Sequence, residues 1–133
     1  MVDDALLKDK VAKETYGVLD SFNKFTQQAP VIIVIVSENP NVTSRMGTFI
    51  KKIEFPLIDI GIAAEHFCLQ ATELGLGTCM IGWFNEKSIK ELLKIPKQSK
   101  VALVITLGYP IEDKIIPKKR KDLGTICSFN KYE

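Results

Sequence analysis

The sequence has few of the residues that hold metals or form disulfides. It contains one histidine, and its three cysteines (Cys68, Cys79 and Cys127) are odd in number and include no Cys-x-x-Cys pair. A structural zinc site needs about four ligands, and a disulfide framework pairs its cysteines evenly. This composition argues against both. We therefore expect no metal site, and free thiols in a reducing cytoplasm.

Long apolar runs and a strong net charge are also missing. The longest unbroken apolar run is Val31–Val36, far short of the roughly 20 residues that span a bilayer. No charged-then-apolar leader stands at the N-terminus, which argues against secretion. The formal net charge of +2 is too small to indicate a nucleic-acid partner by itself. We expect neither a membrane nor a nucleic acid as partner.

What is present is typical of one globular domain. The chain has 133 residues, 46% of them hydrophobic and 26% charged, and no repeat or linker divides it. We therefore expect a single domain over residues 1–133. Apolar residues at helical spacing predict a helix from Asp3 to about Phe22, capped by Asp3 or Asp4. Val31–Val36 predicts a strand with both faces covered, because its apolar residues do not alternate with polar ones.

The second half predicts a long helix, a crossing, a short helix and a strand. The long helix begins at Pro56 and ends on Gly75 and Gly77. It is apolar around most of its circumference, so a large core or a second subunit must enclose it. An irregular crossing over residues 75–84 follows, then a helix over 86–93 capped by Asn85 and a strand over 101–107. Residues 38–44 read as a turn-rich loop, and the pattern of residues 45–55 selects no structure.

Five segments resemble, in the right order, landmarks of the FMN-dependent nitroreductase family. They are Phe22–Val31, Ile58–His66, Gly75–Gly82, Leu107–Pro110 and Pro117–Arg120, and together they cover nearly the whole chain. The resemblance implies an α+β fold with a nitroreductase-like sheet flanked by helices. It also implies a homodimer, with the long central helix at the interface, a C-terminal tail that reaches the partner, and FMN bound between the subunits.

The resemblance implies which residues would meet the flavin ring. The amides of Gly82 and Trp83 would donate to N5 and to the adjacent carbonyl, and Met80 and Ile81 would line the ring. Negative charge develops at these flavin atoms on reduction, and backbone N–H groups stabilise it without titrating themselves. From the residues alone another interpretation stays open, in which the glycines only cap a helix and Trp83 fills the core.

The resemblance also implies that Lys118 and Arg120 reach the FMN phosphate. A guanidinium presents paired donors to a phosphate, and a lysine adds a mobile point charge. The alternative is a solvated basic loop, which is what most short charge runs are. Nuclear localisation or nucleic-acid binding by residues 118–121 is a further alternative, which no aromatic platform or other basic surface supports.

One pair of family landmarks has no counterpart here. Members carry an Arg-Arg-Ser-x-Arg-like segment that grips the FMN phosphate and ribityl chain, followed by an Asn/Ser-Gln-Pro-Trp-like segment, and this sequence contains neither. We therefore expect a chain that is truncated at its N-terminus relative to the family, either because the gene is truncated or because this sequence is part of a longer product. Each lost charge-assisted contact is worth roughly 1.5–3 kcal/mol, so FMN binding should be weakened.

The resemblance predicts an oxidoreductase that passes electrons from NAD(P)H through FMN to nitroaromatic or quinone-like acceptors. The flavin would carry the chemistry, so we assign no catalytic side chain, and we expect His66 to be a packed or hydrogen-bonded interface residue. One alternative is a truncated dimer scaffold with weak or no FMN binding and no catalysis. Another is a module that binds FMN without turnover.

Overall fold

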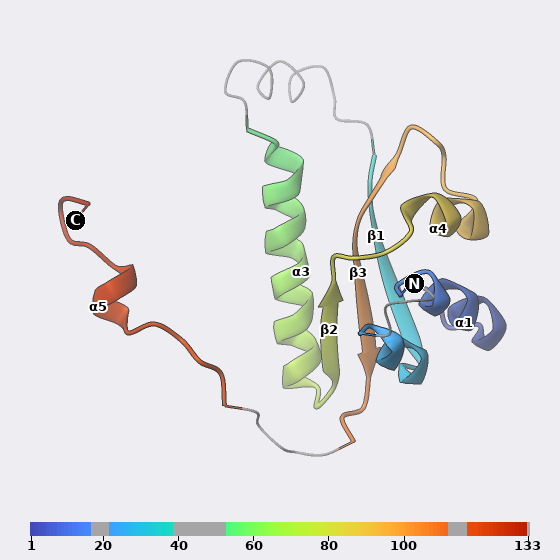
Figure 1. Ribbon diagram of the computed structural model, residues 1–133, viewed down its shortest axis with the longest axis horizontal. Coiled ribbons are helices and arrows are strands. Elements are labelled where there is room, and N and C mark those ends of the chain that lie inside the picture. The colour runs from blue at the N-terminus through green and yellow to red at the C-terminus, as the bar shows by residue number, and fades with distance from the viewer. Residues whose placement is uncertain (17–21, 39–52, 112–116, 133) are drawn as a thin grey trace.

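The structure, a computed structural model, describes residues 1–16, 22–38, 53–111 and 117–132. Expectations for residues 17–21, for the loop over 39–44 and for residues 45–52 lie outside the described residues. The described chain forms an antiparallel sheet with helices on both faces (Figure 1), which confirms the predicted α+β class. Its elements are α1 (Ala5–Lys13), η1 (Lys24–Gln28), β1 (Val31–Ser37), α3 (Phe55–Glu73), β2 (Gly77–Ile81), α4 (Glu86–Leu93), β3 (Lys100–Gly108) and α5 (Leu123–Ile126).

The sheet has the order β1-β3-β2, with both pairs antiparallel. Val104 of β3 lies opposite Val34 of β1 and Ile81 of β2, so one row of side chains crosses the three strands. Val104 and its neighbour Ile105 point to opposite faces, and both are fully buried. Helices α1 and α3 both contact β1. The prediction that both faces of the Val31–Val36 strand are covered is therefore confirmed, with Ile32 fully buried and the rest of β1 half-buried.

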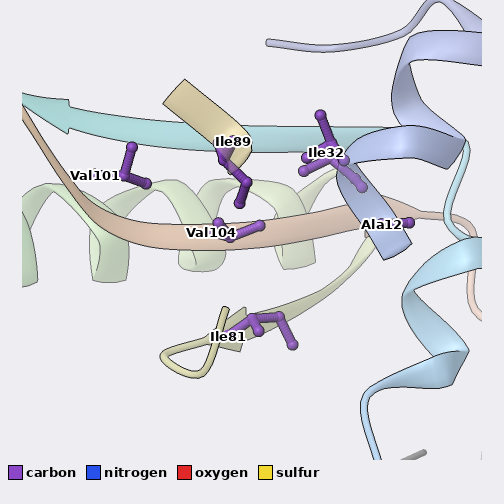
Figure 2. Packing of buried hydrophobic residues seen from close by; sticks show 7 residues of the cluster. Ala12, Ile32, Ile81, Ile89, Val101 and Val104 are labelled. Atoms are coloured by element: carbon purple, nitrogen blue, oxygen red, sulfur yellow. The ribbon is translucent and has the colours of Figure 1, made fainter. Parts of the chain in front are cut away.

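The main core lies between the sheet and the helices α1 and α4. Figure 2 shows its side chains on one face of the sheet, with α3 on the other side. Burying these aliphatic side chains is the chief stabilising contribution at this face. The fully or almost fully buried members are Val11, Ala12, Ile32, Ile81, Ile89, Val101 and Val104.

Helix α1 begins as predicted but ends early. The Asp4 carboxylate accepts a hydrogen bond from the Leu7 amide at 2.8 Å, which confirms Asp4 as the N-cap. The helix ends at Lys13, so residues 14–16, which the prediction included, are not helical. Beyond Lys13 the Thr15 amide and hydroxyl both donate to the Ala12 carbonyl, at 3.0 and 2.7 Å. These short-range bonds replace the next helical turn.

The predicted irregular crossing over residues 75–84 is wrong in its first half. Gly75 ends α3 with a left-handed φ of +72°, as predicted for a C-terminal cap. Gly77, however, is not part of the cap, because it is the first residue of β2. The edge of β3 offers unpaired backbone groups, and pairing satisfies them together with those of residues 77–81.

Helix α3 has Pro56 in its first turn, as predicted, but the described chain leaves much of it uncovered. Only Ala64 and Ala71 of this helix are buried. Ile58, Ile62 and Leu69 share one face and are 50%, 54% and 59% exposed. Figure 1 shows α5 and the C-terminus lying apart from the sheet. Across the described ranges, the helices fall short of the length and hydropathy that a membrane crossing needs.

Candidate functional site

The loop over residues 82–84 joins β2 to α4 and is held at both ends. On one side the last β2–β3 pair is Ile81 with Val104. On the other, Asn85 caps α4 as predicted, since its side-chain oxygen accepts a hydrogen bond from the Ser88 amide at 3.2 Å. The Asn85 amide in turn donates to the Glu14 carbonyl at 2.7 Å, which ties the start of α4 to the end of α1. Residues 82–84 therefore form a short loop whose two ends are both fixed.

The surface in front of this loop is open. A Cβ added to Gly82 would meet no heavy atom within 4 Å. The Trp83 side chain is 70% exposed and that of Met80 is 41% exposed. The Ile81 side chain, in contrast, is 3% exposed and belongs to the core, so only its backbone is available to a ligand.

The two basic residues predicted to hold a phosphate lie on the exposed segment that precedes α5. Both Lys118 and Arg120 are exposed to solvent. Desolvation raises the pKa of the Cys79 thiol, while the positive charge of Lys118 acts in the opposite direction and lowers it. Cys79 belongs to β2, so the charge of Lys118 acts on the strand that leads into the 82–84 loop.

These residues fit one part of an FMN site. A planar ring needs an accessible surface with backbone donors, and Gly82 lets the backbone approach such a ring because it has no Cβ. The Gly82 and Trp83 amides come directly after the last β2–β3 pair. Lys118 and Arg120 supply two cations for a phosphate group. Together, the two amides provide hydrogen-bond donors for a flavin ring, and the two cations provide part of a phosphate site.

Two polar side chains, those of His66 and Asn23, have defined hydrogen-bond partners. His66 contacts the Ile62 carbonyl through Nδ1 at 2.8 Å along α3, so the expected hydrogen bond is present, and its place at a subunit interface stays a prediction. Asn23 was not singled out, although it is only 2% exposed and its side chain reaches the Trp83 carbonyl. The only sequence signal was an asparagine in a polar stretch between two apolar segments, and that pattern does not distinguish a buried side chain from a solvated one.

Comparisons with known proteins match the family that the motifs resemble. A model described as the nitroreductase family matches residues 4–109. A curated relative from Methanocaldococcus jannaschii, whose name includes the word nitroreductase, is 31% identical over 88 residues, which make up 66% of this chain and 42% of that protein. The chain thus spans less than half the length of this relative.

Solved structures show the same likeness. A nitroreductase family protein from Clostridium novyi matches with a TM-score of 0.70 and 35% identity over 85% of this chain and 61% of that chain. An FMN-dependent nitroreductase from Clostridium difficile matches with a TM-score of 0.73 and 27% identity over 98% of this chain and 73% of that chain. The resemblance inferred from the sequence motifs is therefore confirmed.

Proposed function

The chain belongs to the nitroreductase family, and on that premise we propose that it binds FMN and works as an oxidoreductase. The electron donor is NADH or NADPH, and the acceptor is a small nitroaromatic or quinone-like molecule. The expected compartment is the cytoplasm. The observation that carries the proposal is the open, doubly anchored loop over residues 82–84, with unobstructed space in front of Gly82.

In this proposal, one group of residues binds the flavin ring of FMN and another binds its phosphate. FMN, when bound, supplies the two-electron chemistry that the protein itself lacks. The Gly82 and Trp83 amides donate toward the ring atoms at which negative charge develops, and they do so without a titrating side chain. The exposed Met80 side chain and the Ile81 backbone line the ring. Lys118 and Arg120 hold the phosphate, where a guanidinium gives paired donors and an ammonium a point charge.

The same proposal includes a homodimer that buries α3. Ile58, Ile62 and Leu69 form an exposed apolar face on this helix, and such a face is unusual on a monomer surface. The tail adds Leu123, which is 74% exposed, and Phe129, which is 85% exposed. A second copy would cover the helix face, and its core would receive the apolar side chains of the tail.

The dimer is tested by placing a charge on the exposed face of α3. We expect Ile62→Asp to shift the purified protein from dimer to monomer in analytical ultracentrifugation, because the carboxylate would be desolvated between two subunits. Glu91→Gln changes an exposed charged residue on α4, at the opposite face of the sheet from α3, and should leave the mass unchanged. A wild-type protein that sediments as a monomer at micromolar concentration would contradict this part of the proposal.

The activity is tested by following both half-reactions under anaerobic conditions. Protein loaded with FMN should lose its visible flavin absorbance on addition of NADH or NADPH and regain it when a nitroaromatic or a quinone is added. A protein that takes up FMN but is reduced by neither nucleotide would contradict the oxidoreductase activity and leave a binding module. A protein that takes up no FMN would contradict the whole proposal and fit a dimer scaffold without catalysis.

A further inference from the structure

Asn23 is a buried polar residue whose side chain does not cap the helix that it precedes. It occupies the N-cap position of η1, yet it makes no side-chain capping bond there. Its side-chain nitrogen lies instead 2.9 Å from the Thr15 carbonyl and 3.4 Å from the Trp83 carbonyl. Both partners are acceptors, so only the NH2 group of the amide can serve them. Residues 23 and 83 are 60 positions apart in the chain.

The residues that fix Asn23 are themselves buried and bonded. Thr15 and Thr26 are fully buried, and their hydroxyl oxygens lie 2.8 Å apart. The Thr15 hydroxyl also bonds to the Ala12 carbonyl at the end of α1. A satisfied buried network of this kind is rigid, because each broken bond leaves a desolvated polar group without a partner. The amide of Asn23 is therefore held in one orientation.

The hydrogen bonds of Asn23 extend this network to the middle of the loop over residues 82–84. The loop is already fixed at Ile81 by the β2–β3 pairing and at Asn85 by its bond to Glu14. The contact from Asn23 falls between these two points, on the carbonyl of Trp83. A carbonyl held in place limits the rotation of its peptide plane, and in a short loop with fixed ends it limits the neighbouring peptide as well.

We propose that Asn23 is a positioning residue for the flavin-facing loop. By holding the Trp83 carbonyl it fixes the peptide plane between Trp83 and Phe84, and it thereby limits the direction of the Trp83 amide in the neighbouring peptide. This role rests on the proposed function of that amide. The contact to Trp83 is long and partly solvated, so its loss should loosen the loop without unfolding the domain. We expect FMN affinity to fall about fivefold, the effect of one ordinary hydrogen bond.

The test uses Trp83 as its own reporter, since it is the single tryptophan of the chain. The variants are Asn23→Leu, which removes the amide at similar volume, and Asn23→Ser, a milder change in case the first does not fold. Ser99→Ala is the control, because it removes a buried hydroxyl that lies just before β3 and outside the network of Asn23, Thr15 and Thr26. Time-resolved fluorescence anisotropy of Trp83 is measured on flavin-free protein.

We expect a faster local component in the Trp83 anisotropy decay of both Asn23 variants, and an unchanged decay in Ser99→Ala. An unchanged decay in both Asn23 variants, or an equal change in the control, would overturn the proposal. The second measurement is the FMN dissociation constant of the same proteins. If the Asn23 variants have a looser loop but an unchanged FMN dissociation constant, the proposed role of Asn23 at the flavin site is overturned. Wild-type protein that fails to bind FMN would refute the proposed function, while the anisotropy would still decide whether Asn23 holds the loop.

Discussion

Replacing Gly82 with alanine should separate cofactor binding from folding. A Cβ at this position meets no heavy atom within 4 Å, and among the described glycines Gly75 alone has a positive φ. The folded chain therefore tolerates the methyl group, and we expect the midpoint of thermal unfolding to stay within about 2 °C of wild type. The methyl group would occupy the space that a ring needs in order to approach the backbone.

The expected loss of affinity follows from the bonds that this methyl group would prevent. Displacing a ring from the Gly82 and Trp83 amides removes two hydrogen bonds of about 0.5–1.5 kcal/mol each. A loss of ~1–3 kcal/mol corresponds to an affinity for FMN about 5- to 150-fold weaker. Isothermal titration calorimetry with FMN measures this affinity directly.

Gly108→Ala supplies the opposite control. There an added Cβ would lie 2.6 Å from Cδ of Pro30 and 3.2 Å from its Cγ, so the neighbouring chain must shift. Overpacking of this kind costs about 1–3 kcal/mol, or ~4 °C in unfolding midpoint for each kcal/mol. Folded Gly108→Ala should bind FMN like wild type. The reasoning fails if Gly82→Ala binds FMN normally, or if it loses stability as Gly108→Ala does.

Three further predictions concern the phosphate end, the core and the pH dependence. Lys118→Gln should weaken FMN binding about fivefold at low salt, since an exposed charge contributes only ~1 kcal/mol. The same substitution at its exposed neighbour Lys119 serves as the control. Equal losses of FMN affinity at both positions would contradict a specific contact from Lys118. Ile89→Ala should lower the free energy of unfolding by about 2–5 kcal/mol in urea denaturation, because Ile89 is fully buried in the core; a loss under 1 kcal/mol would contradict this packing. Hydrogen bonds from Lys90 and from the Val101 amide lower the pKa of Glu86 below its ordinary value of 4.5. The stability they provide is present above pH 4.5 and is lost as the pH falls through the lowered pKa, so thermal unfolding of Glu86→Gln should show a shallower acid dependence than wild type.

Local signals in the sequence were sufficient for the elements that begin or end on a distinctive residue. Pro56, Gly75 and Asn85 each act through the backbone next to them, as an N-terminal proline, a left-handed cap and a side-chain cap. The run Val31–Val36 predicted a strand because β-branched residues without alternation suit a sheet with both faces covered.

The misassigned elements depend on partners that are distant in the sequence. Strand β2 is short, and its Cys79 and Met80 are exposed while Ile81 is buried, so it carries no alternation that periodicity could detect. Residues 77–81 form a strand because they pair with the free edge of β3. The end of α1 depends on Thr15, whose hydroxyl meets Thr26 of the next element. Of the candidate site, the loop was predictable from its glycines, but the anchoring by Asn23 and Glu14 was not, because burial and long-range bonding leave no local pattern.

The central claim is that the loop after β2 receives the FMN ring, and Trp83 allows a direct measurement. FMN titrated into the purified chain should quench the fluorescence of this single tryptophan in a saturable way, at one FMN per chain. Under the same conditions Gly82→Ala should need at least about fivefold more FMN for half-saturation. Fluorescence that declines only linearly with added FMN, and equally in wild type and Gly82→Ala, would contradict the account.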